Sequence, residues 1–290
     1  MAVSDQLLVV VDPAARRGDG ESVRIAKDVL SAGADIKLSL PDGPEEFARA
    51  LSRRGARRPV VVGDDRALLR AVSVLHRERE LGSCALALVP VGAVVSLAGL
   101  LGVPTGAVAA ARAVLDGGEQ RLDLLVDDSD GVVLGDLHIP PRTGATREGP
   151  AGTASQASAQ GSPGHPLLRT CQTLVRTLAR PVRAPAPVRA PARLRVEADG
   201  ELLVDLDQPV RAMSLSPDPD GGDGLARIEV HPAAEGGTPL SARARTVTVS
   251  GPDFRYLADT LTAGPVRTRT WTARPGAWSL TLPRGEGASA

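Results

Sequence analysis

Aromatic side chains and lysines are both scarce in this chain of 290 residues. It contains two Trp, one Tyr and two Phe, so the hydrophobic core must be built mainly from Val, Leu and Ala. Lys27 and Lys37 are the only lysines. A P-loop requires a lysine directly after its glycines, because that side chain reaches the phosphates of the nucleotide. The shortage of lysine therefore excludes the P-loop class of nucleotide-binding protein.

Cysteine is also rare, and the two cysteines, Cys84 and Cys171, lack the spacing of a metal site. We expect both thiols to be reduced, as is usual in the cytosol. The first residues include Asp5 and no basic region that leads into an apolar core, so the sequence predicts no secretory signal. The expected location is cytoplasmic, with attachment to the inner face of the membrane as a further option.

One uncharged stretch, from residue 81 to residue 111, has a length that suits a membrane span, since about 20 apolar residues cross a bilayer. Its composition argues against insertion, because prolines and glycines interrupt it and Ala replaces much of the Leu and Phe. A strand over 84–89, a turn and a short buried helix over 94–101 fit the pattern better. We favour this soluble segment and keep the transmembrane helix as the alternative.

Apolar runs of strand length alternate with helical patterns through the first 119 residues. This alternation predicts a parallel sheet with helices on both faces, so we assign residues 1–119 to a three-layer, Rossmann-like α/β domain. The predicted strands are 6–11, 36–40, 59–63 and 84–89, and the predicted helices are 23–30, 44–53, 68–75, 94–101 and 105–115.

The stretch from Pro59 to Leu69 is central to this domain. An apolar run ends at Gly63, Asp64 and Asp65 follow, and a helical pattern then begins. Ligands bind beyond the carboxyl ends of strands in an open α/β sheet, because helix N-termini present free N–H groups there. The two aspartates are therefore placed to meet a nucleotide or its metal ion. Alternatively they only cap the helix, and the spacing does not decide between these interpretations.

From Arg121 onward the pattern changes to short strands separated by turns. Two hairpins are indicated, one through the turn 127–131 and one through Asp199-Gly200. Six or more short strands at this spacing predict a β-sandwich domain, which we assign to residues 120–290. The predicted strands are 122–126, 132–139, 194–198, 202–206, 210–215, 226–231, 242–249, 253–257, 266–272 and 277–282.

Residues 140–193 interrupt the second domain as an insertion. Gly, Ser, Ala, Pro and Thr dominate residues 140–165, which predicts disorder, and an amphipathic helix is expected over 165–179. Nine arginines and one glutamate lie between residues 138 and 195. The basic segment 166–195 suits an anionic membrane surface, while a docked helix followed by a solvated linker is the alternative. No nucleic-acid partner is expected, because stacking aromatics are nearly absent there.

Several short motifs occur in an order that resembles one family, the diacylglycerol kinases, which are lipid kinases related to NAD kinase and sphingosine kinase. The resemblance covers nearly the whole chain and includes the glycine turn after the third strand of the α/β domain. Its motifs are Asp12-Pro13 in place of an opening Asn-Pro, Gly63 and Asp65 of the nucleotide loop Gly-Gly-Asp-Gly-Thr, Pro90-Val91-Gly92 at the second loop, Asp123-Leu124 of an Asp-Leu-Gly, residues 253–259, and Arg269-Thr270-Trp271.

The resemblance implies that ATP and Mg²⁺ bind between the domains and that the γ-phosphoryl group passes to a lipid hydroxyl. It implies that Asp65 and Asp123 are the acidic groups of the catalytic centre and the metal ligands. The implied nucleotide-binding residues are Asp12, Gly63, Asp64, Arg66 and Gly92. Two roles are considered for Arg66, which could bind an anion at the start of the helix or pair with Asp64 or Asp65. We favour the pair, because opposite charges within one turn need no ligand to explain them.

The chain also departs from the family pattern. Asp64 and Arg66 stand where the first loop has glycines, Ala67 replaces its threonine, and residues 93–97 replace the polar part of the second loop. Asp259-Thr260-Leu261 replaces Asp-Gly-Glu, so the glutamate that serves as general base is missing at its expected place. Loss of a general base alone costs roughly 10²–10⁴ in rate. Asp199-Gly200-Glu201 is an intact copy of that motif, but it lies in a predicted turn.

Two hypotheses about function follow. The first is a diacylglycerol kinase family protein whose ATP-dependent phosphorylation of a lipid is impaired or absent. The second is a non-catalytic regulatory protein, a pseudokinase that binds a lipid or a nucleotide. ATP and Mg²⁺ are the cofactors under the first hypothesis, and none is required under the second. The partners considered are a lipid substrate or anionic membrane surface and a second copy of the chain.

Overall fold

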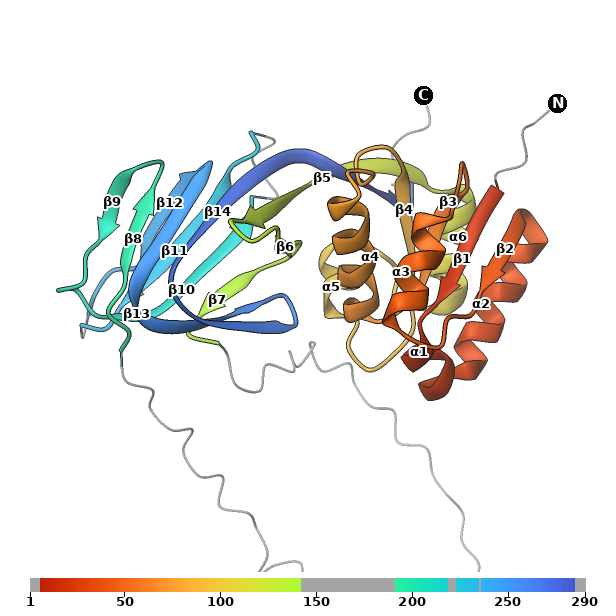
Figure 1. The fold of residues 1–290 in the computed structure, drawn as a ribbon, viewed down its shortest axis with the longest axis horizontal. Coiled ribbons are helices and arrows are strands. Elements are labelled where there is room, and N and C mark those ends of the chain that lie inside the picture. Colours follow the sequence, from red (N-terminus) through yellow and green to blue (C-terminus); the bar gives the residue numbers. More distant parts are fainter. Residues whose placement is uncertain (1–5, 142–190, 219–222, 235, 285–290) are drawn as a thin grey trace, which may run out of the picture. The chain divides into compact units, whose positions relative to one another are not determined.

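The computed structural model describes residues 6–141, 191–218, 223–234 and 236–284 (Figure 1). The chain divides into two compact units, 1–143 with 191–290 and 144–190, and the described residues all belong to the first. The predicted disorder of residues 140–165, the helix over 165–179 and most of the basic segment lie outside the described residues.

A parallel sheet forms the centre of the N-terminal region, in the strand order β2-β1-β3-β4. Strands β1, β3 and β4 are almost entirely buried, which explains why they read as continuous apolar runs in the sequence. Strand β2 is the edge strand and is largely exposed. The strands are β1 (Gln6–Val11), β2 (Asp35–Ser39), β3 (Arg58–Gly63) and β4 (Ala85–Pro90).

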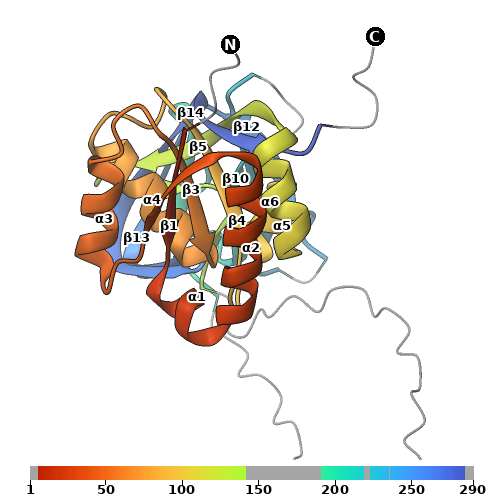
Figure 2. The same cartoon turned by 90° about the vertical axis from the view of Figure 1, so that its right-hand side faces the viewer.

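Helices cover both faces of this sheet, as predicted (Figure 2). On one face, α3 and α4 bury residues such as Phe47 and Leu68 in one hydrophobic core. On the other face, α2 and α6 bury residues such as Leu30 and Val114 in a second core. The helices are α1 (Pro13–Gly18), α2 (Gly20–Gly33), α3 (Pro44–Ser52), α4 (Asp65–Arg77), α5 (Ser96–Leu100) and α6 (Ala107–Asp116).

Two helices differ from the sequence prediction. Helix α1 occupies a stretch predicted as a loop, and its start is explained by Asp12, which accepts a hydrogen bond from the N–H of Ala14, and by Pro13 at the first helical position. Helix α5 is shorter than the predicted 94–101. The strand, turn and helix expected in the uncharged stretch are otherwise present. Among the helices in the described part of the chain, none combines the length and apolar character needed to cross a bilayer.

The C-terminal region is rich in antiparallel strands, as predicted. Both expected hairpins form, one between β5 and β6 and one between β8 and β9. The strands are β5 (Gly118–Asp127), β6 (Val132–Val133), β7 (Leu137–Ile139), β8 (Arg195–Ala198), β9 (Glu201–Val204), β10 (Val210–Pro217), β11 (Ala226–Pro232), β12 (Leu240–Ala244), β13 (Thr246–Ala258) and β14 (Leu261–Leu282).

The continuous sheet of the chain divides at strand β13. The first half of this strand pairs with β8 and its second half pairs with β7, with a register irregularity between Ser250 and Phe254. Side chains of β7, β8, β10 and β11 are buried together in a third hydrophobic core, which includes Trp271. A sheet that divides at a bulge and closes over a common core is the sandwich arrangement that the alternating pattern predicts.

Strand β14 is longer than predicted and links the two regions. The sequence suggests two strands, 266–272 and 277–282, but one strand of 22 residues runs from Leu261 to Leu282. Its first part pairs with β13, and its later part pairs with β5 along Trp271–Leu282. Leu280 also lies beside Leu86 of β4, in parallel orientation. The end of the described chain therefore completes the sheet of the N-terminal region.

Candidate functional site

Four of the predicted site residues meet at the carboxyl ends of β1, β3 and β4. The backbone N–H of Asp12 donates to the carbonyl of Val62 at 2.9 Å, and the N–H of Val91 donates to the carbonyl of Gly63 at 2.9 Å. A Cβ atom added to Gly63 would lie 3.0 Å from that of Asp12, and one added to Gly92 would lie 2.9 Å from that of Asp64. This edge of the sheet is where the sequence places nucleotide binding, and we call it the crevice because ligands of open α/β sheets bind there.

Close packing accounts for both glycines of the crevice. A Cβ atom on Gly63 would lie 2.6 Å from the Cβ of Ala67, so the first turn of α4 approaches the end of β3 too closely for a side chain. Gly92 has a φ of +139°, which L side chains rarely adopt. The two glycines thus permit tight contacts between parts of the chain itself.

The N-terminus of α4 is already occupied by acceptors from the chain. The carboxylate of Asp64 accepts a hydrogen bond from the N–H of Ala67 at 3.1 Å, and the N–H of Asp65 donates to the carbonyl of Val94 at 2.9 Å. A phosphate binds a helix N-terminus through these same donors and the positive end of the helix dipole. Here a carboxylate of the chain accepts a hydrogen bond from one of these donors, so Asp64 is the N-cap of α4.

Asp65 is fully buried, with 0% of its surface exposed. Its carboxylate accepts hydrogen bonds from the hydroxyl of Ser96 at 3.0 Å, the N–H of Leu97 at 3.0 Å and the N–H of Ala98 at 3.4 Å. It therefore caps the start of α5. Burial raises the pKa of Asp65, and the hydrogen bonds from Leu97, Ser96 and Ala98 oppose that shift. The role of a catalytic or metal-binding acid remains a prediction, and none of these contacts points to it.

Asp12 is also buried, and an arginine neutralises it. A guanidinium nitrogen of Arg70 lies 2.6 Å from the carboxylate of Asp12, whose other oxygen accepts the N–H of Ala14 at 2.8 Å. The same guanidinium lies over the ring of Phe47, 5.4 Å from its centroid. Arg70 is thus held on two sides by the chain, and sequence reasoning missed it because nothing local connects positions 12 and 70.

Arg66, by contrast, is exposed. Across the ranges that the structure describes, no ion pair forms between Arg66 and Asp64 or Asp65, so the suggested internal pair is not present. The guanidinium is accessible to solvent.

Asp123, the second predicted catalytic acid, lies elsewhere. Its carboxylate accepts the N–H of Gly276 at 2.7 Å, within the irregular part of β14. The next residue, Ala277, lines a surface hollow together with His76 and Arg79 at the C-terminal end of α4. Asp65 begins the same helix of 13 residues, which is about 18 Å long at 1.5 Å per residue. The structure therefore does not bring Asp65 and Asp123 together.

Asp259, at the position of the Asp-Gly-Glu motif, has a structural role that the sequence does not reveal. It occupies the tight turn between β13 and β14 with a φ of +49°. Its carboxylate accepts the N–H groups of Leu134, Gly135 and Asp136 at 3.0, 2.7 and 3.2 Å. Leu261, which stands where the family has its glutamate, is 53% exposed.

The intact Asp-Gly-Glu at 199–201 is a hairpin turn, as expected. Asp199 and Gly200 have φ values of +50° and +85°, and the carboxylate of Asp199 accepts the N–H of Thr246 at 2.8 Å. This carboxylate ties the turn to β13.

The residues present do not fit Mg²⁺ and ATP in the manner that the family implies. Asp64 occupies the helix N-terminus that would receive phosphate, and the carboxylates of Asp65 and Asp123 are directed at the chain's own N–H groups. Within the described ranges, no three His, Cys, Asp or Glu side chains gather so that they could hold a metal ion.

The pKa of Asp259 gives a testable pH dependence. Burial raises this pKa from 3.8 to about 6, and the three backbone N–H groups only partly oppose the shift. The folded protein therefore binds this proton more tightly than the unfolded chain. Its contribution to stability is fully present below pH about 4 and is lost as the pH rises through about 6.

We expect wild type to lose up to about 3 kcal/mol relative to Asp259→Asn over that range, since one pKa unit corresponds to about 1.4 kcal/mol. Urea unfolding of both proteins at a series of pH values measures the difference. A difference between the two proteins that stays constant from pH 4 to pH 7 would contradict the assignment.

Comparison with known proteins identifies the family that this chain resembles. Residues 6–126 match the model of the diacylglycerol kinase catalytic domain. No curated protein matches this sequence. A solved structure described as "A putative diacylglycerol kinase from Bacillus anthracis str. Sterne" is similar to the chain at 11% identity, with a TM-score of 0.69 over 97% of this chain and 98% of that one.

A second structure, described as a diacylglycerol kinase of the same organism, is similar at 11% identity with a TM-score of 0.66, over the same shares of the two chains. At this identity the likeness shows the fold, and it extends across both regions. Residues 6–126 therefore belong to the diacylglycerol kinase catalytic-domain family, within a chain that has the fold of these bacterial structures throughout.

Proposed function

We propose that this protein keeps the scaffold of a diacylglycerol kinase but transfers phosphoryl groups from ATP poorly or not at all, and acts instead as a non-catalytic, regulatory member of the family. One observation carries the proposal. The carboxylate of Asp64 accepts the N–H of Ala67 at the start of α4, where the family's loop would receive phosphate. An ATP phosphate would have to displace a negative charge that is covalently part of the same loop.

The electrostatics of the crevice support this proposal. Three carboxylates, those of Asp12, Asp64 and Asp65, lie at the ends of β1 and β3. Arg70 is already paired with Asp12, which leaves Arg66 as the basic neighbour within the loop. A polyphosphate is attracted by a helix N-terminus only when nearby charges do not repel it. The crevice therefore favours a neutral or weakly charged ligand over Mg·ATP.

The remaining catalytic groups support it as well. Leu261 replaces the glutamate that would accept the proton of the lipid hydroxyl, and it cannot do so chemically. The carboxylates of Asp65 and Asp123 accept hydrogen bonds from separate parts of the chain, Leu97 and Gly276, so they do not form one metal clamp. Loss of the base and of the metal clamp each removes orders of magnitude of rate, although the losses are not additive.

The competing hypothesis is an active lipid kinase that uses other groups. It requires Mg·ATP to bind the folded protein, and a ligand that binds only the folded state must raise its stability. The active kinase and the proposed protein, in which Asp64 takes the phosphate position, therefore differ in one measurable quantity, the shift in melting temperature caused by Mg·ATP.

We expect wild type to shift by less than about 1 °C with 1 mM Mg·ATP, followed by differential scanning calorimetry, because a ligand far below its Kd adds almost no stability. Asp64→Ser is the matched variant, since serine caps a helix without a negative charge. It should bind ATP more tightly than wild type. A shift of several degrees at micromolar nucleotide in wild type, or phosphorylation of diacylglycerol by the pure protein, would overturn the proposal.

The basic segment favours a second role, attachment to an anionic membrane surface. The stretch 138–195 carries an excess of eight positive charges, nine arginines less one glutamate, in a chain of zero net charge. A segment rich in arginine binds anionic lipid through electrostatic attraction, which salt weakens.

We expect the protein to co-sediment with vesicles that contain phosphatidylserine at 50 mM NaCl and to dissociate at 500 mM NaCl. Deletion of residues 166–195 should abolish this binding, and vesicles of phosphatidylcholine alone serve as the control. Unchanged sedimentation of the deletion variant would disprove the role of the segment.

A further inference from the structure

A surface hollow beside the edge strand of the N-terminal sheet carries an unbalanced charge. It has a volume of about 250 Å³ and lies between β2 and α3. Helix α3 buries Phe47 and Leu51 in the core and leaves the outward part of β2 uncovered. We call it the β2–α3 hollow, and its lining residues are Leu8, Lys37, Ser39, Glu46, Arg49, Ala50 and Arg53.

Three cationic side chains line this hollow, and none of them has an ion-pair partner among the described residues. In the part of the chain that the structure describes, Lys37, Arg49 and Arg53 form no ion pair and no side-chain hydrogen bond. Glu46 is the one acid, and its carboxylate accepts the N–H of Asp42 at 3.0 Å. The formal charge of the lining is therefore three positive less one negative, or +2.

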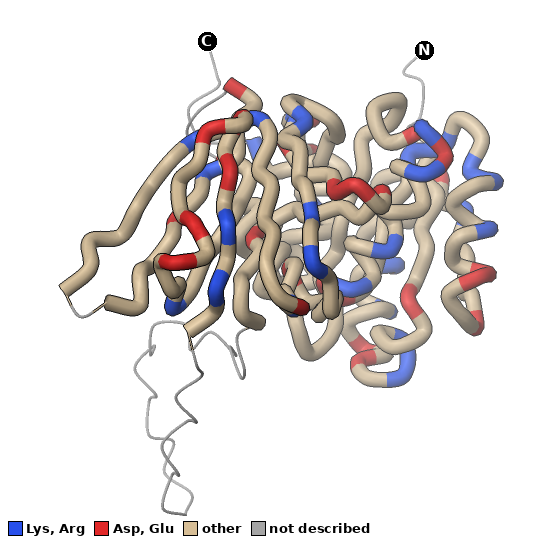
Figure 3. Tube along the Cα trace, turned by 60° about the vertical axis from the view of Figure 1, so that its left-hand side comes forward, with Lys and Arg blue, Asp and Glu red and all other residues tan. Residues whose placement is uncertain are grey.

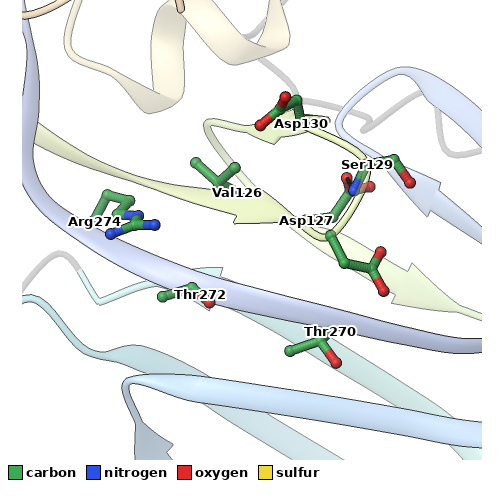
Figure 4. Close-up of a pocket in the computed structure, with 8 residues that line it drawn as sticks. Val126, Asp127, Ser129, Asp130, Thr270, Thr272 and Arg274 are labelled. Atoms are coloured by element: carbon green, nitrogen blue, oxygen red, sulfur yellow. Dashed lines mark hydrogen bonds between the residues drawn. The ribbon is translucent and has the colours of Figure 1, made fainter.

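Other hollows in the described part of the chain are lined differently. One of about 480 Å³ sets Arg274 opposite the acidic turn that includes Asp127 and Asp130 (Figure 4), and one of about 300 Å³ sets His76 within 3.9 Å of Asp130. Basic and acidic positions are also interspersed along much of the tube in Figure 3. The hollow of about 300 Å³ also has more cations than acids, with Arg79 and Arg274 against Asp130. The β2–α3 hollow has the larger excess, three cations against one acid.

Helix electrostatics explain only part of this arrangement. Cations near the C-terminus of a helix are stabilised by its dipole, which accounts for a single arginine near the end of α3. Arg49 and Arg53 are four residues apart, and like charges at that spacing repel. Lys37 comes from a different element, β2, and gains nothing from the dipole of α3. An anion between the three side chains would remove the repulsion.

We propose that the β2–α3 hollow binds a phosphate group. A guanidinium binds phosphate through two parallel hydrogen bonds, the ammonium of Lys37 adds a third charge, and the hydroxyl of Ser39 adds a donor. The volume accommodates one or two phosphoryl groups and is below the usual range for a site that encloses a whole nucleotide. The site shares no residue with the crevice at Asp64, so it does not depend on the proposed function.

Titration calorimetry with inorganic pyrophosphate at 50 mM NaCl tests the site. Wild type should bind with a millimolar or lower Kd that weakens as salt rises, and the double variant Arg49→Gln/Arg53→Gln should bind at least tenfold more weakly. The matched control is Arg211→Gln/Arg245→Gln, two exposed arginines of the C-terminal region, which should bind as wild type does. Melting temperatures show whether each variant is folded.

A further variant separates this site from the crevice. Arg66→Gln should leave pyrophosphate affinity unchanged. No binding by wild type, equal binding by the Arg49→Gln/Arg53→Gln variant, or a loss confined to Arg66→Gln would each overturn the proposal.

The phosphate could belong to a soluble compound or to a lipid headgroup, and a vesicle arm distinguishes them. Wild type and the Arg49→Gln/Arg53→Gln variant, each also lacking residues 166–195 so that the basic segment cannot bind, are sedimented with vesicles that contain phosphatidate. If the variant loses both pyrophosphate and vesicle binding, the ligand is a headgroup. If it loses pyrophosphate binding alone, the ligand is soluble.

Discussion

The buried carboxylate of Asp65 is the contact on which the loops of the N-terminal region depend. It connects the start of α4 to the start of α5 through the hydroxyl of Ser96 and the N–H groups of Leu97 and Ala98. Helix α5 in turn packs against Gly135, whose Cβ position would touch the side chains of α5 and the carboxylate of Asp259. Contacts through Asp65, α5, Gly135 and Asp259 thus connect the crevice to the C-terminal region.

In this protein, acidic side chains at the family's motif positions accept hydrogen bonds from other parts of the chain. Asp64 caps α4, Asp65 caps α5, Asp123 holds the irregular part of β14, and Asp259 holds the loop before β7. Asp65 and Asp259 each accept three hydrogen bonds, which leaves these two carboxylates little capacity for a metal ion. The same residue types that bind a ligand in an active kinase can therefore stabilise a fold once the surrounding glycines and the base are lost.

Much of the fold follows from the sequence, because long apolar runs end at clear turn signals such as Gly63 and Asp199-Gly200. The partners of the site residues do not, because tertiary packing decides which donors reach a carboxylate. Nothing local shows that Arg70 reaches Asp12, or that the strand ending at Leu282 returns to the N-terminal sheet. The location of the crevice was predictable, whereas the direction of each side chain within it was not.

The unfolding free energy of Asp65→Ala tests the central claim most directly. The variant leaves the buried N–H groups of Leu97 and Ala98 without an acceptor, and each such loss costs about 1–3 kcal/mol. The exposed variant Asp28→Ala is the matched control and should change stability by less than about 0.5 kcal/mol. We predict that Asp65→Ala is less stable than wild type by about 3 kcal/mol in urea unfolding. Equal or higher stability, as expected when a residue is kept for catalysis at a cost to the fold, would contradict this account.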